Sequence, residues 1–318
     1  MLSENVHSYL KPELKRLDEL MREIVAGDFP LINHGLERLI NAGGKRLRGI
    51  IVLLAARGNG ANAAPVEQAL ETAAAVELIH LATLIHDDVI DRAAERRGEP
   101  TLHRQLDNQT AVLIGDHLYA RVIHRLTTAL ERLDVIAALA RAVDTLCQGE
   151  IRQLHVSKLE TPLDENGYLR IIQEKTADFF SACGRMGALL TDDVDLIQRL
   201  SEYGLALGMA FQITDDLLDY RGRSDLTGKD SGNDLAEGRI TLPLIHAFER
   251  GAVSPEELAT TPAADIIRRV VECGALESAA AVGEEYINRA LTALNDYPNP
   301  EVGELLRSLV LSISSRDS

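Results

Sequence analysis

Apolar residues recur along this chain every three to four positions, the spacing that is typical of amphipathic helices. This spacing runs through residues 14–25 and again through residues 36–40, until two glycines interrupt it. Residues 50–57 and 69–91 are apolar on nearly all sides, as helices buried inside a larger helical protein are. The pattern predicts two opening helices followed by two core helices.

The same spacing continues to the end of the chain, with glycine and proline signals between the segments. Further helices are expected at residues 110–130, 135–155, 168–190, 196–220, 242–249, 264–273, 276–294 and 302–314. One long irregular stretch, residues 222–239, is rich in Gly, Asp, Lys and Asn, and such a loop is more often functional than idle. The sequence therefore predicts an all-α protein, and because no linker is found, residues 1–318 are expected to form a single domain.

Composition supports the helical prediction and narrows the choice of partners. The chain has 10 prolines and no tryptophan, and its aromatic content of 4% favours packed helices over strands. The formal net charge of −16 repels the phosphate backbone of nucleic acid, so a nucleic-acid partner is not expected. Short basic clusters stand out against this acidic background and indicate a small anionic ligand.

The cysteines and the lengths of the apolar runs indicate the cellular compartment in which the protein is expected. Cys147, Cys183 and Cys273 are widely spaced and form no CxxC pattern, which argues against a disulfide framework and against a zinc site. The first 20 residues have no apolar run of the kind that marks a signal peptide. The longest apolar stretch, residues 50–56, is too short to span a bilayer. We therefore expect a cytoplasmic protein without a transmembrane segment.

Three aspartates end the second core helix, in the sequence Leu-Ile-His-Asp-Asp-Val-Ile-Asp at residues 84–91. Asp87 and Asp91 are four positions apart, so their carboxylates lie on one helix face about 6 Å apart and can hold one cation. Asp88 is rotated by about 100° and is expected to support this pair. A solvated acidic patch is the plainer alternative, but aspartates beside the negative end of the helix dipole cost on the order of 0.3–1 kcal/mol each. A compensating cation is therefore expected.

The same pattern recurs at residues 211–219, where Asp215, Asp216 and Asp219 again end a long apolar helix. Two such motifs in one chain are hard to reach by chance. Carboxylate ligation without Cys or paired His nearby selects a hard cation, and sparse protein ligands that leave room for phosphate oxygens favour Mg²⁺ over Ca²⁺. The two motifs predict a multi-magnesium site that binds a diphosphate between two facing helices.

Two basic clusters provide candidates for binding that anion. The first follows a pair of glycines in residues 43–48, and glycines let a backbone approach a ligand closely. The second lies just beyond the first aspartate motif, and arginine can grip phosphate oxygens in bidentate fashion. Each cluster taken alone also fits a solvated surface. The candidate cations are Lys45, Arg46, Arg48, Arg96 and Arg97.

Two histidines lie on the helix of the first motif. His80 is two turns before Asp87 and near the same face, although a lone histidine in such a place is more often a satisfied core residue. His86 fits the same plain interpretation and is assigned no role.

With these motifs in place, the chain resembles the trans-isoprenyl diphosphate synthases, also called polyprenyl synthetases. The matching segments occur in the family's order and rough spacing over nearly the whole chain, and the chain looks most like the bacterial octaprenyl and related long-chain synthases that supply quinone side chains. The resemblance implies an antiparallel helical bundle around a central active-site cavity, usually in a homodimer, with the two aspartate motifs facing each other. The matching segments are residues 43–48, both aspartate motifs, Arg96-Arg97-Gly98, Lys175-Thr176, Phe211-Gln212 and Gly228-Lys229.

The resemblance also implies roles for the matching residues. The substrates would be isopentenyl diphosphate, bound by Lys45, Arg48, His80 and Arg97 within a cradle that includes Arg46, and an allylic diphosphate, bound by Arg96. Asp87, Asp91, Asp215 and Asp219 would hold Mg²⁺ against the allylic diphosphate, with Asp88 and Asp216 in support. Lys175, Thr176, Gln212 and Lys229 would surround the departing diphosphate and the allylic cation. Neutralising the leaving diphosphate favours ionisation of the allylic C–O bond, and no protein nucleophile is required.

Two departures from the family pattern are visible. Gly49 follows Arg48 where many members have proline, and Gly232-Asn233-Asp234 stands where many have Gly-Asp-Asp. The second departure would weaken one outer contact to metal-bound water. Neither touches the six principal aspartates.

Product length is expected to depend on Ala82 and Thr83, which lie one turn and more before the first aspartates. Family members with short products carry bulky aromatics at these positions, so a small and a moderate side chain predict a long product, from hexaprenyl to decaprenyl. The alternative is that Ala82 only packs against a neighbouring helix.

Several other functions compete with this interpretation. A terpene cyclase would need aromatic faces to stabilise carbocations, and aromatics are scarce here. A head-to-head synthase would be expected to carry aspartates less densely. A shorter-chain farnesyl or geranylgeranyl diphosphate synthase and a noncatalytic regulatory subunit of a heteromeric synthase stay open as alternatives, although no aspartate is missing. A helical scaffold would leave the repeated carboxylate pattern unexplained.

Overall fold

The computed structural model describes residues 4–27, 29–41, 44–96, 98–156, 163–221, 233–236 and 238–314. These residues are almost entirely helical, apart from one short hairpin, which confirms the all-α prediction. The helices are α1 (Glu4–Tyr9), α2 (Lys11–Val25), α3 (Pro30–Asn41), α4 (Leu47–Ala55), α5 (Val66–Ile90), α6 (Leu102–Gln105), α7 (Asn108–Ala129), α8 (Leu133–Val156), α9 (Glu165–Ile172), the π-helix η1 (Gln173–Ala177), α10 (Asp178–Leu189), α11 (Val194–Arg221), α13 (Asn233–Ala236), α14 (Leu242–Glu249), the 3₁₀-helix η2 (Pro255–Ala259), α15 (Ala263–Glu272), α16 (Ala275–Ala293) and α17 (Pro300–Ser314). The antiparallel hairpin pairs β1 (Glu95–Arg96) with β2 (Glu99–Pro100).

Contacts between residues divide the chain into two compact units. The N-terminal unit comprises residues 2–140 and 183–197, and the C-terminal unit comprises mainly residues 141–182 and 198–318. Each unit holds one of the two aspartate motifs. That the whole chain forms a single domain stays a prediction.

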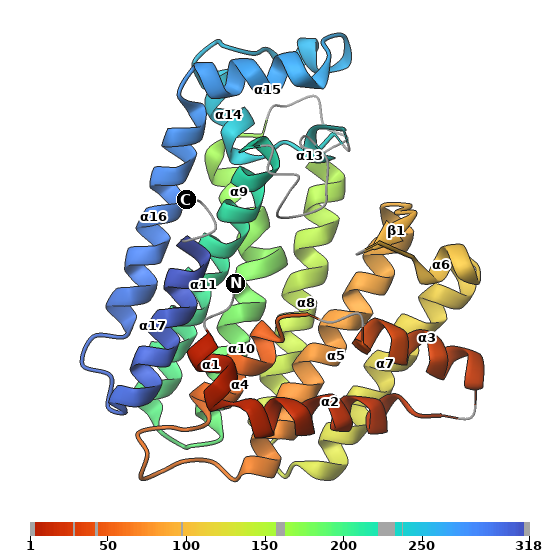
Figure 1. Ribbon diagram of the computed structural model, residues 1–318, viewed down its shortest axis with the longest axis vertical. Helices are drawn as coiled ribbons and strands as arrows, with labels where there is room; N and C mark the ends of the chain where they lie inside the picture. The colour runs from red at the N-terminus through yellow and green to blue at the C-terminus, as the bar shows by residue number, and fades with distance from the viewer. Residues whose placement is uncertain are drawn as a thin grey trace. The chain divides into compact units, whose positions relative to one another are not determined.

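The N-terminal unit is built around α5, which packs against α2, α4 and α7 (Figure 1). Every residue from Ala69 to Ile79 is buried, as the all-round apolar pattern predicts. Even Glu71 is only 7% exposed, and its Oε2 accepts a hydrogen bond of 2.8 Å from Nε of Arg125 on α7. Neighbours on several sides hold α5 firmly, so the position of its last turn, which carries the first aspartate motif, is fixed.

Two glycines of α11 bring that helix close to α10 and η1 in the C-terminal unit. A Cβ at Gly204 would lie 2.4 Å from the carbonyl oxygen of Phe180, and a Cβ at Gly208 would lie 2.6 Å from Cα of Ala177. These glycines are four positions apart and so share a helix face with Gln212, one turn further on. The close approach therefore sets Gln212 beside η1. The core of this unit is completed by apolar residues of α9, α14, α15 and α16.

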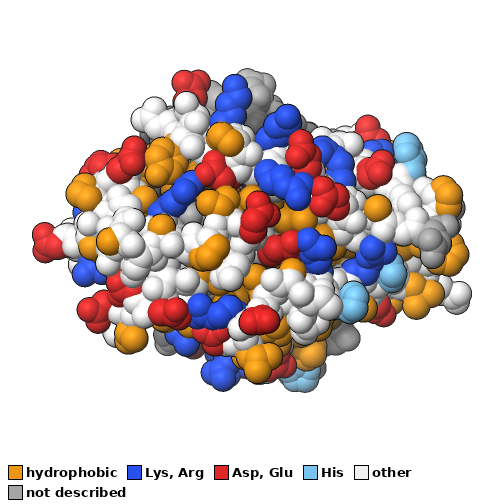
Figure 2. Space-filling view, turned by 90° about the horizontal axis from the view of Figure 1, so that it is seen from below, with side chains coloured by type: hydrophobic (Ala, Val, Ile, Leu, Met, Phe, Trp, Pro, Cys, Tyr) orange, Lys and Arg blue, Asp and Glu red, His pale blue; other side chains and the backbone are white. Residues whose placement is uncertain are grey.

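Basic and acidic side chains are intermingled with apolar ones on the face of the molecule in Figure 2. Pairs such as Arg16 with Glu23, 2.7 Å apart on α2, are exposed and contribute little to stability. No disulfide joins the three cysteines, as their spacing predicts. Within the described residues, no helix combines the length and the apolar character that a membrane span requires.

Candidate active site

The first aspartate motif ends α5, and its three acids lie at different depths. Asp91 is exposed at the end of the helix, and its N–H donates to the carbonyl oxygen of Asp87 at 2.8 Å, which keeps the two acids one turn apart. Asp87 is half-buried, whereas Asp88 is buried. The backbone thus has the helical spacing that the sequence predicts, while the joint binding of a cation by Asp87 and Asp91 stays a prediction.

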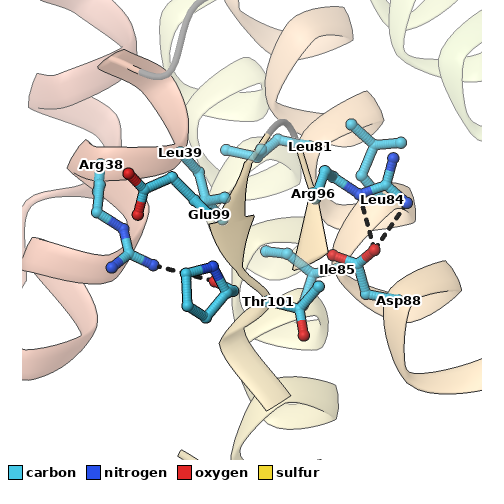
Figure 3. A pocket seen from close by; sticks show the side chains of 10 residues that line it. Arg38, Leu39, Leu81, Leu84, Ile85, Asp88, Arg96, Glu99 and Thr101 are labelled. Atoms are coloured by element: carbon cyan, nitrogen blue, oxygen red, sulfur yellow. Dashed lines mark hydrogen bonds and ion pairs between the residues drawn. The ribbon is translucent and has the colours of Figure 1, made fainter. Parts of the chain in front are cut away.

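Asp88 binds Arg96, which the hairpin turns back toward α5 (Figure 3). Nε and Nη2 of Arg96 each lie 2.7 Å from Oδ1 of Asp88. Burial raises the pKa of Asp88, the Arg96 guanidinium works against this rise, and the charge of Asp91 adds to it. Arg96, predicted to bind the allylic diphosphate, thus contacts the middle acid of the motif in this structure.

A small cavity of about 30 Å³ lies beside Asp88 and Arg96 (Figure 3). Leu81, Leu84 and Ile85 of α5 form its apolar side, and Arg38 of α3 reaches its rim, where Nη2 donates to the carbonyl oxygen of Pro100 at 3.4 Å. The volume holds little more than water. The cavity lies where α3, α5 and the hairpin meet.

The first basic cluster leads into α4. Lys45 is exposed, as a residue that meets a diphosphate would be. Arg46 adopts a left-handed backbone conformation with φ of 46°, and its side chain is directed back into the protein. Its Nε donates to Asp18 at 3.0 Å and its Nη2 to the carbonyl oxygen of Ile40 at 2.7 Å. Arg46 therefore ties α2 and α3 to the start of α4, while Arg48, two residues further on, is partly buried.

The other predicted residues of α5 are packed inside the N-terminal unit. Ala82 is fully buried and Thr83 is 7% exposed, with its hydroxyl donating to the carbonyl oxygen of His80 at 2.8 Å. His80 itself is partly exposed. These positions agree with a role in lining a site, and whether they play that role stays a prediction.

His86 fills a space on α7. A Cβ on Gly115 would lie 2.1 Å from Nε2 of His86, so the missing side chain makes room for the imidazole. That nitrogen also lies 3.1 Å from the carbonyl oxygen of Val112, and the ring stacks on Tyr119. His86 thus has a packing role in this structure.

The second aspartate motif ends α11, and its middle acid is again the buried one. Asp215 is exposed and Asp219 is partly buried, whereas Asp216 is 6% exposed. Two neutral donors hold Asp216: the hydroxyl of Tyr168 donates to Oδ2 at 2.6 Å, and Nε2 of Gln212 donates to Oδ1 at 2.8 Å. Burial together with the nearby charge of Asp234 raises the pKa of Asp216 to about 7, although both hydrogen bonds work against the rise.

Tyr168, on α9, is a partner of this motif that the sequence did not single out. It is buried, and burial and the charge of Asp216 raise the pKa of its phenol well above the ordinary value, so it stays a hydrogen-bond donor. The only signal in the sequence was a tyrosine on the apolar face of a predicted helix. Its partner lies 48 positions away, and no local pattern reports such a contact.

The π-helix η1 carries the predicted pair Lys175 and Thr176. The Thr176 hydroxyl donates to Oε1 of Gln212 at 3.0 Å, so Thr176, Gln212, Asp216 and Tyr168 form one hydrogen-bonded chain. Nζ of Lys175 lies 2.7 Å from Glu150 and donates to Gln153 at 3.0 Å, both on α8. Three of the predicted catalytic residues, Lys175, Thr176 and Gln212, are thereby positioned by contacts of the C-terminal unit.

Asp234 directly follows Asn233, the residue that departs from the family pattern. Its N–H donates to Oδ2 of Asp219 at 3.1 Å, and its carboxylate lies 3.6 Å from Nη1 of Arg239. It thus adds a further acid beside Asp219. Arg97, Gly43, Gly228, Lys229 and Gly232 lie outside the described residues.

The donors of both motifs suit a hard divalent cation, since the side chains concerned are carboxylates. In each unit the buried middle acid has its pKa raised partly by a neighbouring carboxylate, Asp91 in one case and Asp234 in the other, and a bound cation would relieve this repulsion. No group of three acids, histidines or cysteines forms a ready-made metal cage in the part of the chain that the structure describes. Each motif thus fits a cation that takes further oxygens from water or substrate.

The helical architecture and the two aspartate-rich helix ends define an isoprenoid synthase. The chain belongs to the polyprenyl synthetase family, whose profile matches residues 29–270. It is therefore a prenyltransferase that makes prenyl diphosphates.

The chain is similar to named relatives over nearly its full length. It is 36% identical to heptaprenyl diphosphate synthase component 2 of Geobacillus stearothermophilus, with 98% of each chain covered. It is 33% identical to the octaprenyl diphosphate synthase of Escherichia coli, with 99% of each chain covered. The crystal structure of the polyprenyl synthase from Caulobacter crescentus, complexed with calcium and isoprenyl diphosphate, matches with a TM-score of 0.89 at 34% identity and covers 99% of this chain and 98% of that one. Other relatives are named for nonaprenyl and geranylgeranyl products, so the family does not define a product length.

Proposed function

We propose that the protein condenses isopentenyl diphosphate head-to-tail onto an allylic diphosphate and releases a long, all-trans polyprenyl diphosphate, octaprenyl-like, for quinone side chains. The observation that carries this proposal is that both aspartate motifs are complete and that each presents its outer pair one turn apart at a helix end. Relatives named for heptaprenyl and octaprenyl products support the long chain.

The proposed metal is Mg²⁺, which when bound would offset the charge of the allylic diphosphate as its C–O bond ionises. Asp87 and Asp91 would supply ligands from one motif, and Asp215 and Asp219 from the other, with Asp88 and Asp216 in support. Calcium in the crystal structure from Caulobacter crescentus supports a divalent cation of this hard class.

Basic residues would bind the two diphosphates. We propose Lys45, Arg48, His80 and Arg97 for isopentenyl diphosphate and Arg96 for the allylic diphosphate. Arg46, whose donors are used within the fold, would shape the first cluster.

Residues around η1 would act on the developing charge. The ammonium of Lys175 adds positive charge, and its contacts with Glu150 and Gln153 limit the directions in which it can point. The Thr176 hydroxyl donates to Gln212, and this leaves oxygen lone pairs of both side chains to face a cation. Lys229 is proposed to join this group.

Product length would depend on Ala82 and Thr83, because bulk at a position that lines the path of the growing chain blocks it. Ala82→Phe is expected to shorten the products, and Ala82→Val to shorten them less. The products are sized by chromatography of the labelled lipids. An unchanged distribution in both variants would refute the assignment of Ala82.

The deciding experiment incubates the purified protein with Mg²⁺, labelled isopentenyl diphosphate and either farnesyl or geranylgeranyl diphosphate, and then sizes the lipid. We expect stepwise elongation to roughly hexaprenyl to decaprenyl length. A product that stops at farnesyl or geranylgeranyl would support the shorter-chain alternative. Failure to elongate any primer would overturn the proposal for the isolated chain.

A two-component enzyme is a second candidate, because one relative is named as component 2 of a heptaprenyl diphosphate synthase. In that case the chain would become active only when a second protein is added. The complete aspartate motifs favour a catalytic rather than a regulatory role even then. Light scattering of the active sample tests the homodimer and, with the assay, separates the two cases.

A further inference from the structure

Glu77 is a buried acid in the middle of α5 that has no role in the mechanism proposed above. Its side chain is 6% exposed, and it lies nearly three turns before Asp87 on the same helix. An ionised carboxylate is costly in such a place unless it is both paired with a cation and hydrogen-bonded. Its surroundings should therefore provide a donor and a positive charge.

The donor comes from the first turn of α4. The N–H of Gly49 donates to Oε1 of Glu77 at 2.8 Å. This N–H is one of the first four of a helix, which have no partner within the helix itself. The residue before α4, Arg46, makes no side-chain cap, so Glu77 provides a cap from a different helix. A carboxylate at this end of α4 is also favoured by the helix dipole.

Gly49 is suited to this contact in two ways. A Cβ would lie 3.1 Å from Cδ2 of Leu17 and 3.2 Å from Cγ of Glu77, so a side chain would crowd both neighbours. Proline has no N–H and could not make the hydrogen bond. The glycine that looked like a departure from the family pattern thus has a specific partner on α5.

The positive charge comes from the basic cluster. Nη1 of Arg46 lies 4.0 Å from Oε2 of Glu77. Burial lowers the pKa of Arg48, and the charge of Glu77 works against this effect. The nearby Cys183 thiol does not provide a second negative charge for Arg48, because burial raises the pKa of the thiol far above neutral. Glu77 therefore contacts the Arg46 guanidinium and the backbone of the turn that carries Arg48, and its charge also acts on Arg48.

We propose that Glu77 is a positioning residue for isopentenyl diphosphate, acting through Arg48 and the first turn of α4. This inference rests on the proposed function of the basic cluster. The carboxylate compensates the buried guanidinium and fixes the N–H of Gly49, so it determines the direction in which residues 45–48 present their charges. Glu77 itself does not touch the substrate.

The test compares Glu77→Gln with Glu71→Gln. Both residues are buried glutamates of α5, and each variant removes one negative charge, but Glu71 pairs with Arg125 on α7 and lies away from the basic cluster. Both variants should lose stability in thermal denaturation. Only Glu77→Gln should raise KM for isopentenyl diphosphate, by roughly tenfold, with a smaller change in kcat and in KM for the allylic primer.

A second pair of variants tests the hydrogen bond alone. Gly49→Pro removes the N–H and keeps every charge, and it should raise KM for isopentenyl diphosphate by a few-fold. Gly49→Ala keeps the N–H and reports the crowding against Leu17. If E77Q does not fold, the Gly49 pair decides the question by the same measurement.

The outcomes separate this inference from the proposed function. If the wild type elongates primers and KM for isopentenyl diphosphate is unchanged in E77Q, or changes equally in E71Q, the positioning role is refuted and the enzyme assignment stands. If the wild type does not elongate, the proposed function fails. Titration of inorganic pyrophosphate into wild type, E77Q and E71Q then still tests whether Glu77 orders an anion site, and equal affinities would refute it.

Discussion

Asp88 and Asp216 occupy the same place in the two aspartate motifs, yet different partners surround them. Asp88 binds the guanidinium of Arg96, which cancels its charge locally. Asp216 is held by a phenol and an amide, and other carboxylates lie near it. Among the described residues, one buried acid is therefore compensated by a cation, while the other is hydrogen-bonded to neutral groups.

This difference shows that a repeated sequence pattern does not imply a repeated electrostatic environment. A salt-bridged acid depends on a single partner, and loss of that partner leaves a buried charge. An acid held by neutral donors can instead take up a proton when no cation is present. The two motifs should accordingly resemble each other in catalysis and differ in how they respond to pH and to loss of a partner.

The largest effect is expected at the outer acids. Asp87→Asn and Asp215→Asn should each lower kcat by up to about 1,000-fold, because each removes a charged ligand that counters the developing diphosphate charge. The measurement is steady-state elongation at saturating Mg²⁺. Asp195→Asn, an exposed acid at the other end of α11, is the control and should be silent. Full activity of either outer variant would show that its motif is not catalytic.

The pH dependence of stability should reveal Asp216 in metal-free protein. Because the folded-state pKa is about 7 and the unfolded value is near 4, the folded protein binds one extra proton between these values. The extra proton stabilises the folded state, and this contribution to the free energy of unfolding is fully present below about pH 4. It is lost as the pH rises to about 7, at about 1.4 kcal/mol per pH unit.

Denaturant unfolding of wild type and Asp216→Asn in chelator, from pH 4 to pH 8, measures this slope. The difference between the two proteins removes the contributions of other acids, including Asp88. A pH-independent difference would show that Asp216 titrates normally.

A smaller effect on stability distinguishes the charged partner of Asp88 from the neutral partners of Asp216. Arg96→Gln removes the cation from Asp88 and should cost about 1–3 kcal/mol of unfolding free energy, whereas Tyr168→Phe removes one neutral donor and should cost about 1 kcal/mol. Both values come from chemical denaturation at pH 7 without metal. The exposed Arg268, which pairs with Glu272 on α15, provides a control, since Arg268→Gln should change stability by less than about 1 kcal/mol. If Tyr168→Phe lost more unfolding free energy than Arg96→Gln, the neutral partner would matter more than the charged one, contrary to this prediction.

Most of the helices could be predicted from the spacing of apolar residues, because a helix with one buried face has apolar residues every three to four positions. The expected helix at residues 69–91 is α5, Val66–Ile90, and the expected helix at 196–220 is α11, Val194–Arg221. The hairpin was not predicted, because two-residue strands leave no periodic trace. The predicted helix at 168–190 is interrupted by η1, where the backbone packs closely against Gly149 of α8. The sequence did not predict this interruption, because contacts with a distant helix do not affect local periodicity.

The candidate site also has features that the sequence could predict and features that it could not. The spacing of Asp87 and Asp91, and the rotation of Asp88 away from them, follow from helix geometry, so the sequence was enough to predict these relations. The partners of the buried acids depend on contacts across many positions of the chain, such as Tyr168 with Asp216 and Gly49 with Glu77. A single sequence has no signal for these pairs.

The wide turn at Gln173–Ala177 has a consequence for how this chain can change in evolution. A π-turn holds one more residue than an α-turn, and each residue of a helix advances it by about 100°. Deleting a single residue there would turn Tyr168 away from Asp216 or Lys175 away from Glu150, while every side chain remained chemically intact. Natural variation in this segment should therefore exchange residues freely at its exposed positions but keep its length constant.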